Sequence, residues 1–208
     1  MKRKGVLFVI SGFAGAGKGT LVRMLVEKHD NYALSVSATT RKPRDGEIEG
    51  VHYFYKTKEE FLEMIEKGML YEYAQYVDHY YGTPKEYVQK QLEAGKDVIL
   101  EIEIQGALKI KEQFPDTLLL FVTPPDADTL EARLRGRGTE TDDVIQKRLS
   151  RAVEESEVIS QYDYIIVNDV AEEAAEEIHA IIQSEHYAVQ RNQDFIKNLR
   201  DDLCKFKQ

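Results

Sequence analysis

The chain has 208 residues, of which 42% are hydrophobic and 31% are charged, and this balance excludes an intrinsically disordered chain. Its formal net charge of −9 repels nucleic acid and anionic membranes, so an anionic ligand requires a local basic cluster. No apolar run approaches the roughly 20 residues that span a bilayer, and a single cysteine, Cys204, precludes an intrachain disulfide. We therefore expect a cytoplasmic protein with no nucleic-acid or membrane partner.

Short apolar runs alternate with helical patterns along the chain. We predict helices over residues 20–29, 85–94, 105–113 and 126–135, and strands over 6–11, 33–37, 97–103, 117–123 and 162–167. Continuously apolar strands are typical of parallel sheets, and their alternation with helices predicts right-handed βαβ units. The predicted fold class is α/β, with a doubly wound parallel sheet as its core.

Two segments interrupt this alternation. Residues 38–83 are rich in Tyr, Gly and charge, with short strand candidates at 51–55 and 70–77, and residues 133–151 are Arg-rich. We interpret them as two lobes above the carboxyl edge of the sheet, where α/β proteins bind ligands. The prediction is one domain over 1–208, with its core at about 5–37, 84–132 and 152–208.

The tail from about residue 171 is one long helical pattern. We expect a helix that packs on the core, as most amphipathic helices do. The same apolar stripe could also mediate self-association, so a homodimer stays open.

A glycine-rich segment lies between the first strand and the first helix. Its glycines let backbone N–H groups face inward as an anion nest, and the helix N-terminus adds partial positive charge. Lys18 can reach the β- and γ-phosphates of a nucleotide. We predict an ATP-binding loop formed by Gly12, Phe13, Ala14, Gly15, Ala16, Gly17, Lys18, Gly19 and Thr20.

One position of this loop departs from the usual motif. Gly19 stands where Ser or Thr commonly contacts Mg²⁺. Thr20 can substitute, or the metal can be held largely through water, phosphate oxygens and carboxylates. We expect Mg²⁺ as the cofactor, bound together with ATP.

A second basic cluster follows the second strand. Arg41 and Arg44 are three residues apart, close enough to converge on one dianionic phosphate with paired, charge-assisted hydrogen bonds. Three further short motifs follow, namely Gly50-Val51-His52-Tyr53-Phe54, Glu72-Tyr73-Ala74 and Tyr80-Tyr81-Gly82-Thr83-Pro84.

In these motifs the chain resembles a bacterial-type guanylate kinase, from about residue 5 to residue 169. The resemblance implies that ATP and GMP are the substrates. It also implies that the GMP phosphate is held by Arg41, Arg44, Tyr53 and Tyr81, and the guanine by Ser37, Glu72 and Thr83. The chemistry supports this role for Glu72, because a carboxylate can accept from both the N1–H and the 2-amino group of guanine. Adenine would leave it unpaired, at a cost of about 2–5 kcal/mol. Members of this family usually have Pro-Ser in place of Phe13 and Ala14, and we expect modestly altered kinetics from the difference.

Acidic residues end the strand predicted over 97–103. In a strand, Glu101 and Glu103 would point to the same face. Carboxylates at this edge can orient Mg²⁺-bound waters or the acceptor ribose, and residue types alone do not divide those roles. The resemblance places Glu103 close to the nucleoside, and we assign both residues to the GMP site.

The Arg-rich segment 133–151 suits a lid. Phosphoryl transfer needs positioned cations and exclusion of water more than covalent help. The resemblance implies that Arg133, Arg137 and Arg148 act there, with Lys18 across the transferred group, whereas Arg135 and Arg151 are weaker candidates. It also places Asn168 near the adenine of ATP, although Asn-Asp turns are common for local reasons. The expected catalytic set is Lys18, Arg41, Arg137 and Arg148.

The leading hypothesis is an enzyme that moves the γ-phosphate of ATP to GMP in one in-line step. A kinase for another monophosphate is the nearest rival, and Glu72 decides between them. A catalytically weak guanylate-kinase-like binding module is the alternative outside catalysis, although such modules typically lose parts of the basic set that this chain retains. A P-loop GTPase switch is disfavoured because the chain contains no Asn-Lys-x-Asp signature.

Overall fold

The structure is a computed structural model that describes residues 4–76, 78–136 and 141–207. Its core is a five-stranded parallel sheet in the order β2-β7-β1-β8-β9. The strands are β1 (Leu7–Gly12), β2 (Tyr32–Leu34), β7 (Asp97–Glu101), β8 (Leu118–Thr123) and β9 (Tyr164–Val167). The predicted doubly wound α/β core is therefore confirmed.

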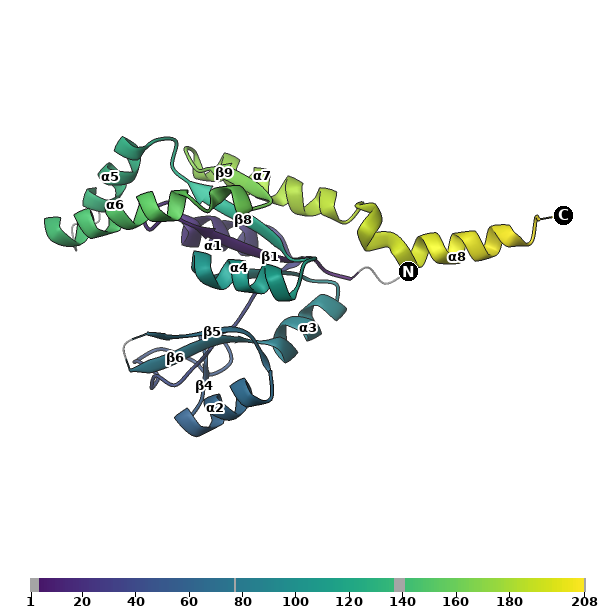
Figure 1. The fold of residues 1–208 in the computed structure, drawn as a ribbon, viewed down its shortest axis with the longest axis horizontal. Coiled ribbons are helices and arrows are strands. Elements are labelled where there is room, and N and C mark those ends of the chain that lie inside the picture. The colour runs from purple at the N-terminus through teal and green to yellow at the C-terminus, as the bar shows by residue number, and fades with distance from the viewer. Residues whose placement is uncertain (1–3, 77, 137–140, 208) are drawn as a thin grey trace.

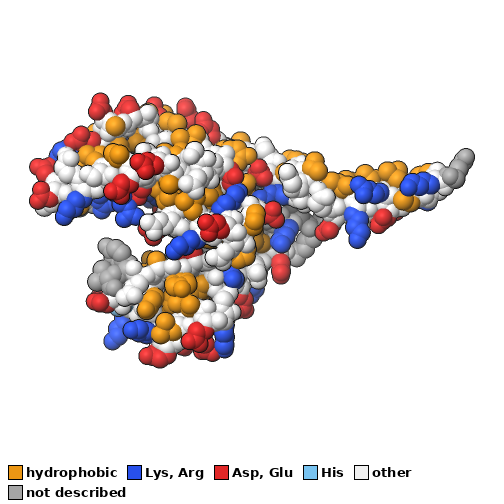
Figure 2. Space-filling view, in the orientation of Figure 1, with side chains coloured by type: hydrophobic (Ala, Val, Ile, Leu, Met, Phe, Trp, Pro, Cys, Tyr) orange, Lys and Arg blue, Asp and Glu red, His pale blue; other side chains and the backbone are white. Residues whose placement is uncertain are grey.

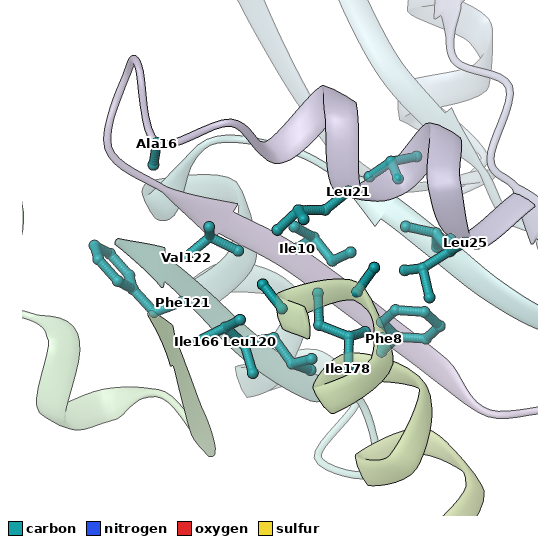
Figure 3. Packing of buried hydrophobic residues seen from close by; sticks show 14 of the residues in the cluster. Phe8, Ile10, Ala16, Leu21, Leu25, Leu120, Phe121, Val122, Ile166 and Ile178 are labelled. Atoms are coloured by element: carbon teal, nitrogen blue, oxygen red, sulfur yellow. The ribbon is translucent and has the colours of Figure 1, made fainter. Parts of the chain in front are cut away.

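Alternate residues of β1 face the two sides of this sheet. Phe8 and Ile10 pack with α1 (Lys18–Lys28) and α7 (Ala171–Glu185) on one side, as Figure 3 shows for Leu21, Leu25 and Ile178. Leu7 and Val9 pack with α3 (Lys85–Glu93) and α4 (Ile104–Gln113) on the other. Burial on both faces explains why these strands are apolar throughout.

A second, four-stranded sheet lies beside the core, in the lower part of Figure 1. Its order is β4-β3-β6-β5, formed by β3 (Ala38–Thr39), β4 (Phe54–Tyr55), β5 (Leu70–Tyr76) and β6 (His79–Pro84). It packs on α2 (Lys58–Glu66), whose Phe61 is fully buried against Ala38 and Leu70. Figure 2 shows the surface hollowed between this unit and the core.

The helix α2 and the strand β6 were not predicted, and the strand predicted over 51–55 shortens to its last two residues. A capping box did signal α2: Thr57 accepts from the Glu60 N–H at 3.1 Å, and Glu60 accepts from the Thr57 N–H at 2.7 Å. The strand predicted over 33–37 is also shorter and begins earlier than expected, since β2 covers Tyr32–Leu34.

Two helices, α5 (Ala127–Gly136) and α6 (Asp142–Ser156), follow β8 in the chain and precede β9. They extend beyond the edge of the sheet (Figure 1). The 3₁₀ turn η1 (Ile159–Gln161) leads from α6 back to β9. Leu130, Leu134 and Ile145 anchor the pair in the main hydrophobic cluster. Arg137 lies outside the described residues.

The tail is not one helix, so that expectation is wrong. The helix α7 ends at Glu185, a 3₁₀ turn η2 follows (Val189–Asn192), and α8 (Gln193–Cys204) runs away from the body of the protein (Figure 1). The Asn192 side-chain amide donates to the carbonyls of His186 and Ala188 at 2.9 Å each, and these bonds cap the break. In the described ranges, no helix combines the length and the apolar character needed to cross a bilayer.

Candidate active site

The glycine-rich loop forms at the carboxyl end of β1, where three glycines have positive φ angles: 140° at Gly12, 92° at Gly15 and 90° at Gly17. At Gly12 a Cβ would lie 2.0 Å from the carbonyl oxygen of Val122 in β8. At Gly17 it would lie 2.4 Å from the side-chain nitrogen of Asn168. Any larger residue would therefore disrupt the loop at both positions.

Lys18 begins α1 directly after the loop. Its ammonium donates to the carbonyls of Gly12 at 2.8 Å and Phe13 at 3.0 Å. The side chain thus folds back along the loop, where its charge lies beside the backbone that would cradle phosphates.

Phe13 turns its ring into the protein core. The side chain is buried and makes an edge-to-face contact with Phe121 at 5.0 Å, and Phe121 makes another with Tyr162 at 5.2 Å. The ring therefore anchors the loop to the core.

Asn168 connects the turn after β9 to the same loop. Its side chain is 4% exposed and donates to the carbonyl of Ala16 at 2.7 Å. Arg133, near the end of α5, donates to the backbone carbonyl of Asn168 at 2.8 Å and to that of Asp169 at 3.4 Å. A continuous set of hydrogen bonds thus joins α5, this turn and the glycine-rich loop.

The two acidic residues after β7 occupy different environments. Glu101 ends the strand with its carboxylate beside Gly19, where a Cβ would lie 3.6 Å from the Glu101 Oε1. Desolvation raises the pKa of Glu101, and the charge of Lys18 opposes the shift. Glu103 lies beyond the strand, at the N-cap of α4, and pairs with Arg151 of α6 at 3.1 Å. The expectation that both residues lie on one strand is therefore wrong, because β7 ends at Glu101.

Arg41 lies in the segment after β3. Its guanidinium binds Glu47 through two hydrogen bonds of 2.8 and 2.9 Å, and its Cζ lies 5.3 Å from the centre of the Tyr53 ring. Tyr53 in turn contacts Tyr81 of β6 edge-to-face at 6.1 Å. The exposed Arg44 follows in the same loop. The structure thus brings together three of the four residues predicted to hold the acceptor phosphate: Arg41, Tyr53 and Tyr81.

Glu72 of β5 and Thr83 of β6 form the polar centre of the second sheet. The fully buried Thr83 hydroxyl donates to the Glu72 carboxylate at 2.8 Å. Burial raises the pKa of Glu72, and the nearby charge of Glu103 adds to the rise, whereas Thr83 and Lys109 oppose it. A Cβ at Gly106 of α4 would lie 3.7 Å from the Glu72 Oε2, so this carboxylate lies where β5 approaches helix α4 of the core.

The remaining predicted residues are less closely placed. Ser37 is half-buried just before β3, and its carbonyl accepts from the Phe54 N–H at 2.9 Å. Arg148 is half-buried on α6. Sequence reasoning missed Glu47 and Tyr55 as members of the phosphate cluster, although the Gly-Glu pair next to the two arginines was the available signal for Glu47.

A glycine loop at the carboxyl edge of a parallel sheet, facing a lobe with paired arginines, defines a P-loop nucleoside monophosphate kinase. The guanylate kinase family model matches residues 4–185. A curated guanylate kinase from Caldanaerobacter subterraneus is 50% identical over 97% of this chain and 98% of its own length. Another, from Lactococcus lactis, is 49% identical over 98% and 99%.

The solved structures agree with this match. The crystal structure of guanylate kinase from Anaplasma phagocytophilum superposes with a TM-score of 0.70, at 32% identity, covering 92% of this chain and 91% of its own. The chain belongs to the guanylate kinase family.

Proposed function

We infer that this protein transfers the γ-phosphate of ATP to GMP, giving ADP and GDP. The observation that carries the acceptor assignment is the hydrogen bond between the half-buried Glu72 and the buried Thr83, on the same sheet as Tyr81 of the cluster around Arg41. A desolvated carboxylate is complementary to the adjacent N1–H and amino donors of guanine and would be left unpaired by adenine.

On the donor side, residues 12–20 would wrap the ATP phosphates with backbone N–H groups. Lys18 would exchange the carbonyls of Gly12 and Phe13 for the β- and γ-phosphates. Arg133, Arg137 and Arg148 would approach from the lid at about 133–151 and stabilise the charge on the transferred group. Asn168 would bind on the adenine side while its amide holds the loop.

On the acceptor side, the lobe at about 38–83 would hold GMP. The geometry after β3 supports a phosphate site, because the Arg41 guanidinium lies beside Tyr53 and Tyr53 contacts Tyr81, and both tyrosines can donate hydroxyl hydrogen bonds. Ser37, Glu72 and Thr83 would bind the base, and Glu101 and Glu103 would lie near the ribose and the reacting phosphates. The members of the phosphate site are Arg41, Arg44, Tyr53 and Tyr81.

The residues present fit Mg²⁺ bound with ATP. Thr20 offers a hydroxyl in the first turn of α1, and the Glu101 carboxylate lies beside Gly19, so oxygen donors flank the loop. These two side chains would hold the ion largely through water. Bound there, Mg²⁺ would neutralise charge on the β- and γ-phosphates.

The helix α8 supports a homodimer. Ile196, Leu199 and Leu203 are spaced three and four residues apart, and Leu199 and Leu203 are 46% and 54% exposed. Figure 2 shows hydrophobic side chains along this projecting helix. Pairing with the same stripe of a second copy would bury the apolar side chains symmetrically.

Consumption of GMP and ATP also fits purine nucleotide metabolism in the cytoplasm.

The test of the function is ADP release from MgATP with GMP, dGMP, AMP, UMP or CMP as acceptor, with Lys18→Ala as the control. We expect turnover with guanine acceptors alone, and its loss in the control. Turnover with AMP or a pyrimidine would overturn the acceptor assignment. A folded protein that binds GMP without turnover would instead be the binding module.

A further inference from the structure

Glu47 accepts four hydrogen bonds in the loop between β3 and β4. Two come from the Arg41 guanidinium, at 2.8 and 2.9 Å, one from the backbone N–H of Arg44 at 2.7 Å, and one from the Tyr55 hydroxyl at 2.8 Å. The side chains of Arg41 and Glu47 are only 12% and 18% exposed. This is a built arrangement, in contrast to a solvated surface ion pair, because every bond converges on one carboxylate.

These contacts occupy one end of the guanidinium. Glu47 takes one hydrogen from each terminal nitrogen, Nη1 and Nη2, and the Lys42 carbonyl takes a second hydrogen from Nη1 at 2.8 Å. A guanidinium has five N–H donors, so Glu47 and Lys42 leave the Nε–H and the second Nη2–H for other partners, and these two donors share one edge. That edge is itself a two-pronged donor with the geometry of a phosphate or carboxylate fork.

Two tyrosines lie beside the guanidinium of Arg41. The Tyr53 ring lies 5.3 Å from the guanidinium carbon, and Tyr81 contacts Tyr53. Glu47 raises the pKa of Arg41, and Tyr81 contributes to the rise. The guanidinium is therefore fixed at one end by a carboxylate and bordered by the two tyrosines proposed to bind the same phosphate.

We propose that Glu47 is a positioning residue that holds Arg41 with its Nε/Nη2 edge toward the acceptor phosphate, and that fixes the loop from which Arg44 extends. This inference rests on the proposed role of Arg41 in GMP binding. Glu47 would not touch GMP. Its contribution would be to preorganise the donor fork, so that binding does not have to immobilise a long, mobile side chain.

The arrangement has an electrostatic cost that makes the proposal specific. A carboxylate beside Arg41 cancels much of the positive charge that would attract a dianion. Glu47 therefore strengthens GMP binding only if the gain from orienting the Arg41 guanidinium exceeds the loss of attraction for the phosphate. Its hydrogen bonds, first those from Arg41, lower the pKa of Glu47 to about 2. Glu47 therefore stays ionised throughout the working pH range, and its effect should not titrate there.

The test compares GMP with guanosine, since only GMP carries the phosphate. In Glu47→Gln we expect GMP to bind about 10- to 100-fold more weakly, the loss associated with misaligning a charge-assisted pair. Guanosine affinity and the KM for ATP should stay within about twofold of the natural chain. Calorimetric binding and steady-state kinetics supply the two readouts. The matched control is Glu49→Gln, because Glu49 accepts the Tyr55 N–H at 2.8 Å in the same loop.

A double-mutant cycle tests whether Glu47 acts through Arg41. In the Arg41→Ala background, Glu47→Gln should change GMP affinity by less than about twofold. Equal losses for GMP and guanosine, tighter GMP binding, or full additivity with Arg41→Ala would each overturn the positioning role. If Arg41→Ala alone leaves GMP affinity unchanged, the phosphate role of Arg41 itself fails, and this outcome is distinguishable from failure at Glu47.

Discussion

The side-chain amide of Asn168 lies 2.7 Å from the carbonyl oxygen of Ala16, across 152 residues of sequence. The bond closes the glycine-rich loop from the side of β9, and it fills the space that a side chain at residue 17 would need. The loop conformation therefore depends on its own glycines and also on a buried hydrogen bond from Asn168, which follows the edge strand β9.

Removal of the Asn168 hydrogen bond should weaken both ATP binding and the stability of the fold. In Asn168→Ala the Ala16 carbonyl loses its buried donor, so we expect a loss of about 1–3 kcal/mol in the free energy of unfolding. The KM for ATP should rise while the KM for GMP changes little. Thermal denaturation and kinetics in both substrates provide the measurement, and Asp169→Ala is a neighbouring control. A rise confined to the KM for GMP would contradict the assignment.

Substitution of Glu72 should reduce GMP use without creating an AMP kinase. In Glu72→Gln the side chain still accepts the Thr83 hydrogen bond, but its amide N–H groups cannot pair with the guanine donors. We expect kcat/KM for GMP to fall roughly 30- to 1,000-fold, which corresponds to a loss of about 2–4 kcal/mol in transition-state stabilisation. Steady-state rates with GMP and AMP check this, and an unchanged value for GMP would rule out base recognition by Glu72.

The rings of His29 and His179 stack at 3.7 Å between α1 and α7, and this contact should make stability depend on pH. Burial and then His29 lower the pKa of His179 from its ordinary value of 6.5, against the pull of Glu176 and Asp97. A lowered folded-state pKa favours the neutral ring, so its stabilisation is present above about pH 6.5 and is lost as the pH falls toward the folded-state pKa.

Melting temperatures between pH 7.5 and 5.5 test this dependence. The natural chain should lose more stability over that range than His179→Gln, because the variant has no ring to protonate. Parallel curves for the two proteins would mean that acid destabilisation arises elsewhere.

The proposed homodimer makes a prediction about α8. Leu199→Glu places a charge in the exposed apolar stripe, so the protein should sediment with the mass of one chain. Asn198→Glu adds the same charge one residue earlier and should leave the dimer intact. Sedimentation equilibrium distinguishes the two variants. A natural chain that is already monomeric at high concentration would overturn the proposal.

The inward-facing ring of Phe13 predicts a stability effect larger than its kinetic effect. Phe13→Pro/Ala14→Ser removes the contact with Phe121 from the main cluster, so we expect a loss of about 3 kcal/mol or more in the free energy of unfolding. Turnover should change by less than about tenfold, because backbone N–H groups form the cradle. Urea unfolding and turnover measure the two effects, and a gain of several orders of magnitude in turnover would contradict this view.

The core strands and the phosphate loop could be predicted because their signals are local. Phe8, Ile10 and their neighbours form unbroken apolar runs, and the glycines around Lys18 fall at fixed spacing. The acceptor lobe was harder, because its strands are short and Phe61 of α2 becomes buried only through pairing with distant residues.

Tertiary contacts decide the remaining details. The pairing of Glu103 with Arg151 joins residues 48 positions apart, and the hydrogen bond from Asn168 to Ala16 spans 152 positions. Neither contact therefore leaves a periodic pattern in the sequence. The break before α8 was missed because Asn192 acts by bonding backbone carbonyls, which no propensity reveals. The ordered set of motifs still identified the family, since each motif contributes separately.

The second sheet has its own small core, in which Ala38, Phe61 and Leu70 are the buried members, whereas β1, β7 and β8 are buried between two layers of helices. Parts of a protein with less buried apolar area open at lower free energy, and their amides exchange with solvent sooner. Amide protection should therefore rise from the strands that carry Glu72 and Thr83 to the strand that precedes the phosphate loop. The enzyme would then bind its nucleotide donor on its most rigid element and its acceptor on a unit that can open without unfolding the rest.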